Sequence, residues 1–482
     1  MTQLTPEQLS TFFDSEEFCQ TGHALIDVLG QYLQENLQGS GAVIAWQAPQ
    51  AAIMNWQQPL PLQPTLTPAS FISALQDKVL AANLHIHHPR NMGHQVAPPL
   101  PLAALCDLVA ALSNQAMAVY ETGPSATLIE KQVVQWMGAL VGWSDATGFL
   151  TSGGAQANLT ALLAARQSVA GWNVWQHGVS AGKPLCLFAS EHAHYSVSRA
   201  AGIMGLGSDA VIKVAADSKG CMDVNALQTA WRQCQTQGQL PIAVVATAGC
   251  TPTGSIDPLL AIGHFCREKN LWFHVDGAHG ASALLSPVLG QQLHGIALAD
   301  SVVWDGHKLL YMPAAVSAVL FRVQKNSYAA FAQEASYLFQ GNEDADEAYN
   351  MSYRTLECTK RMMGLKLWAA FSLYGVENLA ALVEQVFSVA SLLAQKLEAA
   401  PDFELLMQPQ TNIVCFRHLP TARLSAEALN THQARLRMKL VEDGAFHLTQ
   451  VTLQGQYWLR TTIMNPLTCE SDLDALLLAL SV

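Results

Sequence analysis

A lysine follows directly after an apolar, β-branched segment of the chain. Residues 301–304 are typical of a buried strand, and Asp305, Gly306, His307 and Lys308 come immediately after them. An amine at the mouth of a buried strand is partly desolvated, which disfavours the ammonium form and leaves a nucleophile that can condense with an aldehyde. The same residues could also mark a strand end that faces water, so the rest of the chain must decide between the two interpretations.

An acidic residue closes a second apolar segment. Asp276 follows residues 272–275, and a carboxylate at such a strand end needs a partner. A protonated pyridine nitrogen would supply one, because opposite charges about 4 Å apart are worth roughly 4 kcal/mol at an effective dielectric near 20. A helix cap or a metal ligand is the alternative. Metal ligation is the weaker of these, since His274 and His279 lack a matching set of carboxylates and histidines, and we predict no metal site.

Two glycines precede a strongly helical stretch. Gly153 and Gly154 lie within residues 151–158, and residues 159–166 follow as a helix. Backbone N–H groups exposed there, together with the positive end of the helix dipole, favour an anion such as a phosphate. An ordinary helix cap is the alternative, because the segment lacks the lysine of a P-loop and the spacing of a dinucleotide fingerprint.

Two further strand ends carry polar side chains. Thr251 follows the segment 242–246, and His194 follows the segment 184–188. His194 could stack on a planar heterocycle, although a histidine after a strand can also be purely structural. A phosphate cradle, an acid for a ring nitrogen, a stacking imidazole and a strand-end lysine together predict a pyridoxal phosphate site at the carboxyl edge of one sheet.

Alternating elements must position these residues. Short apolar segments such as 184–188, 242–246 and 271–275 alternate with helix-like stretches, which predicts an α/β fold with a mostly parallel sheet covered by helices. The first hundred residues contain amphipathic helices, for example 18–37, and a Pro-rich stretch. We expect an N-terminal helical arm over 1–105, a large cofactor-binding domain over 106–375 and a small C-terminal α+β domain over 376–482.

Composition narrows the function classes. Half of the 482 residues are hydrophobic, 13% are charged and the formal net charge is -12. This balance argues against nucleic acid and favours a homo-oligomer that covers apolar surface. No membrane segment or leader is expected, so we predict a cytoplasmic protein. The ten cysteines include no C-x-x-C pair and predict no zinc site; only Cys250, beside the predicted ligand loop, stands out.

With these residues in hand, the chain resembles the group II pyridoxal-phosphate-dependent amino acid decarboxylases. The family includes aromatic-amino-acid, glutamate, cysteine sulfinate and diaminobutyrate decarboxylases. The resemblance covers most of the chain, and its motifs occur in family order at residues 88–90, 121–127, 151–158, 276–278, 305–308, 356–361 and 459–460.

The resemblance implies a fold and a set of roles. The fold is that of aspartate aminotransferase, fold type I, with a mostly parallel seven-stranded sheet. Lys308 would form the Schiff base with pyridoxal 5'-phosphate, and Asp276 would pair with the pyridine nitrogen. Ala278 and His194 would sandwich the ring, and Arg460 would anchor the substrate carboxylate. The phosphate would be held by Gly154, Ala155, Thr251 and His307. The resemblance also implies a homodimer whose active sites are built from both chains.

Loss of carbon dioxide must be followed by protonation at Cα, because protonation on the cofactor would give a transamination product. In related enzymes a tyrosine on a mobile loop assists this step. The corresponding segment here, residues 341–353, is polar and acidic, as expected of a lid. Tyr349 and Tyr353 are both candidates for the tyrosine.

Substrate choice is expected to depend on residues 88–95. This segment lacks the residues that follow His-Pro in aromatic-acid and glutamate enzymes, and the placement of His94 is more similar to diaminobutyrate decarboxylases. We therefore predict decarboxylation of L-2,4-diaminobutyrate to 1,3-diaminopropane. The alternatives are an aromatic substrate (tyrosine or DOPA), an acidic one (glutamate or aspartate), another pyridoxal phosphate reaction such as transamination, or a homologue without catalysis.

Overall fold

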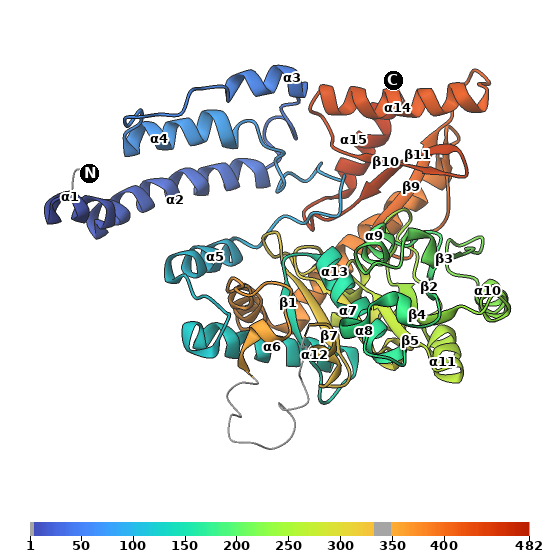
Figure 1. Ribbon diagram of the computed structural model, residues 1–482. Coiled ribbons are helices and arrows are strands. Elements are labelled where there is room, and N and C mark those ends of the chain that lie inside the picture. Colours follow the sequence, from blue (N-terminus) through green and yellow to red (C-terminus); the bar gives the residue numbers. More distant parts are fainter. Residues whose placement is uncertain (1–3, 332–348, 482) are drawn as a thin grey trace. The chain divides into compact units, whose positions relative to one another are not determined.

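The computed structural model describes residues 4–331 and 349–481. These residues form two compact units, which Figure 1 shows in colours that follow the sequence. The large unit comprises residues 95–417 and 462–466, and the terminal unit comprises residues up to 94, 418–461 and 467 onward.

The described part of the large unit contains a seven-stranded sheet in the order β1-β7-β6-β5-β4-β2-β3. β7 pairs antiparallel with both β1 and β6, whereas the other neighbouring pairs are parallel. The predicted α/β fold with a mostly parallel sheet is therefore confirmed. The strands are β1 (Thr147–Thr151), β2 (Leu185–Ser190), β3 (Val211–Val214), β4 (Leu240–Thr247), β5 (Trp272–Asp276), β6 (Ser301–Asp305) and β7 (Ser317–Phe321).

The central strands form because their residues are apolar on both faces. Residues 242–246 of β4 have no exposed surface, and the same holds for Val275 of β5 and Val302 of β6. A continuous apolar run is what a parallel strand covered on both sides requires. The strands predicted over 242–246, 271–275 and 301–304 are thus confirmed, within a residue or two at their ends.

Helices cover this sheet. α7 (Gly154–Val169) packs against β4, β5, β6 and β7, and its residues Ala157, Ala161 and Leu162 have no exposed surface. The small side chains allow the helix to approach the sheet closely, and this brings polar residues of α7 to the strand ends. Further elements of the large unit are α5 (Pro101–Ser113), α6 (Pro124–Val141), α9 (Ser196–Ile203), α10 (Val224–Thr236), α11 (Leu259–Lys269), β8 (Phe403–Leu405) and β9 (Ile413–His418).

The longest helix, α13 (Gly364–Ala399), is non-helical at Gly375. By length and composition it is the one helix in the described residues that could cross a membrane. Val383, Ala390 and Leu393 on this helix are nevertheless fully buried in the structure. A long apolar helix is also what a large core requires, so its composition alone carries no argument for a membrane.

The terminal unit joins the two ends of the chain. It contains α2 (Ser15–Leu37), α4 (Pro68–Ala74), α14 (Ala426–Glu442), β10 (Thr449–Leu453), β11 (Gln456–Thr462) and α15 (Glu470–Leu480). The backbone N–H of Val43 donates to the carbonyl of Gly444 at 2.8 Å, and Arg90 Nε lies 3.1 Å from Asp472 Oδ1. The terminal unit is thus formed by residues from both ends of the chain and not by one continuous segment. The three consecutive parts expected from the sequence, with boundaries at 105 and 375, stay a prediction.

Candidate active site

A cavity of about 420 Å³ lies at the carboxyl edge of the sheet in the large unit. This volume is within the range of small-molecule sites, and the position is the one at which open α/β sheets bind ligands. Its lining includes all eight residues predicted to bind the cofactor, namely Gly154, Ala155, His194, Thr251, Asp276, Ala278, His307 and Lys308. The structure therefore brings together side chains that are separated by more than 150 residues in the sequence.

Asp276 lies on one side of this cavity, at the end of β5. Its side chain is buried, and it accepts hydrogen bonds from Asn158 Nδ2 at 2.9 Å and from the backbone N–H of Ala278 at 3.2 Å. Thr247 on β4 is the register partner of Asp276 and also lines the cavity. The buried Thr247 Oγ1 has no hydrogen-bond partner among the described residues. An unused hydroxyl beside a carboxylate suits a polar ligand in this cavity.

His194 lies near Asp276 and follows β2. Its Nδ1 is 2.9 Å from Ser196 Oγ, and its ring centroid is 4.1 Å from that of Tyr195. Burial lowers the pKa of His194, and the nearby carboxylate of Asp276 offsets this in part by raising it. The imidazole is therefore neutral at pH 7, as a flat stacking group in a cofactor site should be.

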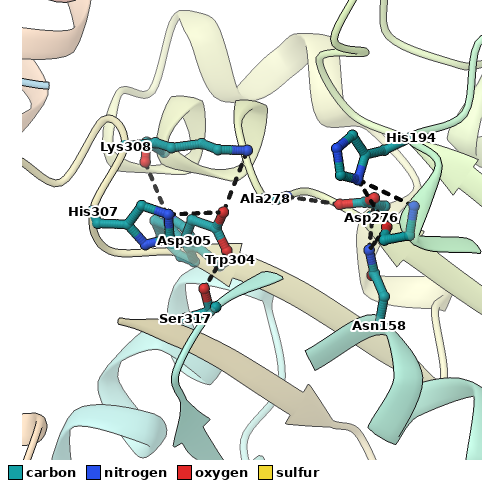
Figure 2. A network of polar contacts seen from close by, with 12 residues as sticks. Asn158, His194, Asp276, Ala278, Trp304, Asp305, His307, Lys308 and Ser317 are labelled. Carbon is teal, nitrogen blue, oxygen red and sulfur yellow. Dashed lines mark hydrogen bonds and ion pairs between the residues drawn. The ribbon is translucent and has the colours of Figure 1, made fainter. Parts of the chain in front are cut away.

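Lys308 lies on the other side of the cavity, as Figure 2 shows. Its Nζ is 3.3 Å from Asp305 Oδ2, and His307 Nε2 is 3.6 Å from the same oxygen. Asp305 is buried, and Ser317 Oγ donates to its other carboxylate oxygen at 2.5 Å. The carboxylate thus holds the lysine amine at the cavity.

The predicted phosphate cradle is the start of α7, which begins at Gly154. A Cβ atom on Gly154 would lie 2.9 Å from Asp305 Oδ1, so only glycine fits without a shift of that carboxylate. The close approach explains why a glycine opens the helix here. The backbone N–H groups at the start of α7 and the helix dipole suit the phosphate of pyridoxal 5'-phosphate.

Other predicted residues lie away from the cavity. The ring of Tyr349 packs on Tyr120 at 5.5 Å between centroids and on Lys131 Nζ at 4.3 Å, and neither Tyr349 nor Tyr353 lines the cavity. Residues 341–348 of the predicted lid are outside the described residues. The role of either tyrosine in protonation stays a prediction. Cys250 is buried, and its Sγ lies 3.1 Å from Thr253 Oγ1.

His94 and Arg460 belong to the terminal unit. The ring centroid of His94 is 5.6 Å from that of His447, and His447 Nδ1 is 2.8 Å from Asn91 Oδ1. The backbone N–H of Met92 donates to the carbonyl of His447 at 2.8 Å. The segment predicted to choose the substrate is therefore fixed by residues near the other end of the chain.

Burial lowers the pKa of His94, and the charges of Arg460 and Arg437 lower it further. Burial also lowers the pKa of His447, to about 4, with smaller contributions in the same direction from His94 and Arg437. Both imidazoles are therefore neutral at pH 7 and lie in a cationic environment.

Sequence reasoning missed three residues of this arrangement. Asp305 gave a signal that could have been used, because an acid three residues before a reactive lysine can reach its amine. Asn158 is the last residue of the glycine-rich segment 151–158, and its contact with Asp276 spans 118 residues. The contact between Asn91 and His447 spans 356 residues, and the sequence offered no signal for it.

Comparison with known proteins agrees with this geometry. Residues 70–419 match the family described as "Pyridoxal-dependent decarboxylase conserved domain". Cysteine sulfinic acid decarboxylase of Mus musculus is 33% identical over 399 residues, which are 81% of each chain. L-2,4-Diaminobutyrate decarboxylase of Acinetobacter baumannii is 28% identical over 411 residues, 83% of this chain and 80% of that one. A crystal structure of mouse CSAD superposes with a TM-score of 0.88 and 30% identity, covering 95% of this chain and 98% of that one.

The fold is thus that of a fold type I pyridoxal-phosphate enzyme. The chain belongs to the pyridoxal-dependent decarboxylase family and is an amino acid decarboxylase that uses pyridoxal 5'-phosphate.

Proposed function

We propose that the substrate is an L-amino acid with an acidic side chain, and that His94 and Arg460 take part in binding it. One observation carries the proposal: the positive charges of Arg460 and Arg437 both lower the pKa of the exposed His94 imidazole, so two guanidinium groups influence the same ring. A single guanidinium is enough for the α-carboxylate that every amino acid carries. A second cation beside it favours a further carboxylate or a sulfinate over an ammonium group.

The position of His94 in the chain supports this assignment. The next two residues, Gln95 and Val96, line the cavity that also contains Lys308 and Asp276. His94 directly precedes these two residues in the chain, and for this reason we include it among the proposed substrate contacts. The names of the relatives point the same way, since the mouse protein at 33% identity is a cysteine sulfinic acid decarboxylase.

Pyridoxal phosphate, when bound, supplies an electron sink for the electrons of the breaking bond between Cα and the carboxylate. The proposed role of Lys308 is to hold the cofactor through its amine, with Asp305 at 3.3 Å to take up a proton from that amine. Asp276 would face the ring nitrogen as a carboxylate, with its oxygens oriented by Asn158 and Ala278. His194 would cover the ring as a neutral imidazole and exclude water from it.

L-2,4-Diaminobutyrate, the substrate predicted from the sequence, is the second candidate. A specific observation favours it: the diaminobutyrate decarboxylase of Acinetobacter baumannii is 28% identical over 83% of this chain. Its side-chain ammonium would meet the charges of Arg437 and Arg460, which is the reason that we place it second.

A substrate panel tests the proposal. Purified holoenzyme is assayed with L-aspartate, L-glutamate, L-cysteine sulfinate, L-2,4-diaminobutyrate, L-tyrosine and L-DOPA, and both carbon dioxide and the amine are measured. We expect one of the three acidic amino acids to give the highest kcat/KM. In the variant Arg437→Gln the preference for that acid over diaminobutyrate should fall by about tenfold, the effect of one charged contact. A higher kcat/KM with diaminobutyrate in the wild-type enzyme would reverse the order of the two candidates.

We also propose that the protein acts as a homodimer. The N-terminal residues expose large apolar side chains, with Phe13, Leu60 and Leu62 each more than 80% exposed. Apolar surface of this kind favours coverage by a second copy, as the family resemblance implies. Sedimentation analysis of the full chain should give twice the 52.0 kDa mass of one chain, and a monomer at micromolar concentration would contradict the proposal.

A cytoplasmic location is proposed on the composition of the chain, with ten cysteines that form no disulfide in the described structure. Fractionation of cells that express the full chain tests it, and recovery in the membrane or secreted fraction would contradict it.

A further inference from the structure

The amide of Asn158 lies between Asp276 and His194. Asn158 projects from α7 and is 1% exposed. Its Nδ2 is 2.9 Å from Asp276 Oδ2 and also 2.9 Å from Ser196 Oγ, while its Oδ1 is 2.9 Å from His274 Nε2. Figure 2 shows Asn158 below Asp276, with contacts leading toward His194. One side chain therefore contacts three polar groups, and its donors and acceptor are all used.

The hydrogen bonds of Asn158 to Asp276 and His274 determine which of these groups carry a proton. An amide nitrogen only donates and an amide oxygen only accepts, so the nitrogen must face the carboxylate of Asp276. The oxygen then faces His274, and His274 Nε2 must carry a proton. His274 Nδ1 is left to accept from Ser301 Oγ at 2.8 Å. Burial lowers the pKa of His274, which agrees with one neutral tautomer.

The same reasoning determines the tautomer of His194. The second N–H of Asn158 donates to Ser196 Oγ, so the hydroxyl proton of Ser196 is free to point at His194 Nδ1, 2.9 Å away. The backbone N–H of Ser196 points at the same nitrogen at 3.3 Å. Two donors directed at Nδ1 require that this nitrogen accepts. In a neutral ring the proton is then on Nε2, the other edge of the imidazole.

We propose that Asn158 is a positioning residue that fixes the proton arrangement on both groups, holding Asp276 as an acceptor-only carboxylate and His194 as the Nε2–H tautomer. The proposal rests on the proposed roles of Asp276 and His194 in the cofactor site. It assigns to His194 a hydrogen-bond donor on the ring edge away from Ser196. Asn158 itself does not act on the reacting atoms in this proposal but acts through these two groups.

The first test reads the tautomer directly. The full-length protein is labelled with ¹⁵N-histidine, and magic-angle-spinning NMR distinguishes protonated from unprotonated ring nitrogens; the variant His194→Gln assigns the signal. We expect an unprotonated Nδ1 and a protonated Nε2 in the wild-type protein, with and without pyridoxal phosphate. In Ser196→Ala and Asn158→Ala both tautomers should be present. A wild-type His194 with its proton on Nδ1 would overturn the proposal.

The second test separates the two branches through cofactor affinity, measured by the visible absorption of bound pyridoxal phosphate. Asn158→Asp has nearly the same size but directs an oxygen at Asp276, so the dissociation constant should rise about 10- to 100-fold, the effect expected when a charged acceptor loses its donor. Ser196→Ala leaves the contact between Asn158 and Asp276 in place, and its affinity should stay within about threefold of the wild type.

Thr160→Ala is the matched control, because Thr160 is a fully buried polar residue on the same helix and lies outside this network. It should change neither the tautomer nor the affinity, and its thermal unfolding shows what a buried deletion on α7 does by itself. Wild-type affinity and tautomer in Asn158→Asp would overturn the proposal. Both measurements are made without substrate. An error in the proposed substrate class would therefore not change them, and the failure of one proposal can be told apart from the failure of the other.

Discussion

The cavity of the large unit and the His94 segment of the terminal unit are assembled in different ways. In the cavity, the polar groups lie at or just after the ends of strands of one sheet, as Asp276 is the last residue of β5 and Lys308 follows β6. The position of the His94 ring depends instead on its contact with His447, which lies 353 residues further along the chain. The proposed catalytic groups are therefore positioned by the strands of one sheet. The proposed substrate contacts are positioned by packing between the N-terminal and C-terminal segments of the chain.

Lys308→Ala tests the cavity most severely. Without the amine the protein cannot hold the cofactor covalently, so activity should fall by at least about four orders of magnitude, as for other enzymes that lose a nucleophile. Carbon dioxide release and the visible absorption band of the bound cofactor measure the effect. Retention of the band in the variant would show that another group binds the cofactor.

Asp276→Asn should have the next largest effect. The substitution keeps the size of the side chain but removes a charge that is worth about 4 kcal/mol at 4 Å, so kcat/KM should fall roughly a thousandfold. Thermal unfolding serves as the control, because a near-isosteric change should leave stability within a few degrees of the wild type. A decrease in kcat/KM of less than tenfold would contradict the proposed contact between Asp276 and the ring nitrogen.

Gly93→Ala tests the terminal unit. The added Cβ would lie 2.4 Å from the ring of His447, which cannot turn freely because its Nδ1 is held by Asn91. We expect a loss of about 1–3 kcal/mol in stability. If the segment binds substrate, KM should also rise, by about tenfold, with kcat within roughly a factor of two.

Gly22→Ala in α2 is the control, since a Cβ there meets no atom within 4 Å and alanine should stabilise the helix by about 0.5–1 kcal/mol. If wild type and Gly93→Ala have equal KM and kcat, the segment around His94 does not take part in substrate binding.

The smallest expected effect is on acid stability. Burial lowers the pKa of His447 to about 4, below its ordinary value of 6.5, so the unfolded chain binds more protons than the folded protein between these values. Stability therefore falls as the pH is lowered from 6.5 toward 4. His447→Gln should reduce the slope of unfolding free energy against pH in this window by up to about 1.4 kcal/mol per pH unit.

His274 in the large unit also has a lowered pKa, so part of the acid sensitivity should remain in His447→Gln. Denaturant unfolding between pH 4.5 and 7.5 measures both slopes. An unchanged slope in the variant would mean that His447 is charged in the folded protein.

Much of the site could be predicted because strand ends are visible in a sequence. Residues 242–246, 272–275 and 301–304 are apolar runs, and parallel strands place their carboxyl ends at one edge. The side chains that follow them had to converge. The hydrogen bonds of Asn158 could not be found in this way, because the packing of α7 on the sheet decides which residues its side chain meets.

The sequence by itself determined the chemistry of this protein: the lysine, the acid, the glycine-rich turn and the order in which they follow apolar strands. Only the tertiary structure decided which groups carry protons and what surrounds His94. Hydrophobic periodicity reports on local burial and direction, and so it places strand ends. A hydrogen bond requires two particular atoms to lie about 2.9 Å apart, and for residues as distant as Asn158 and Asp276 only the packed fold sets that distance.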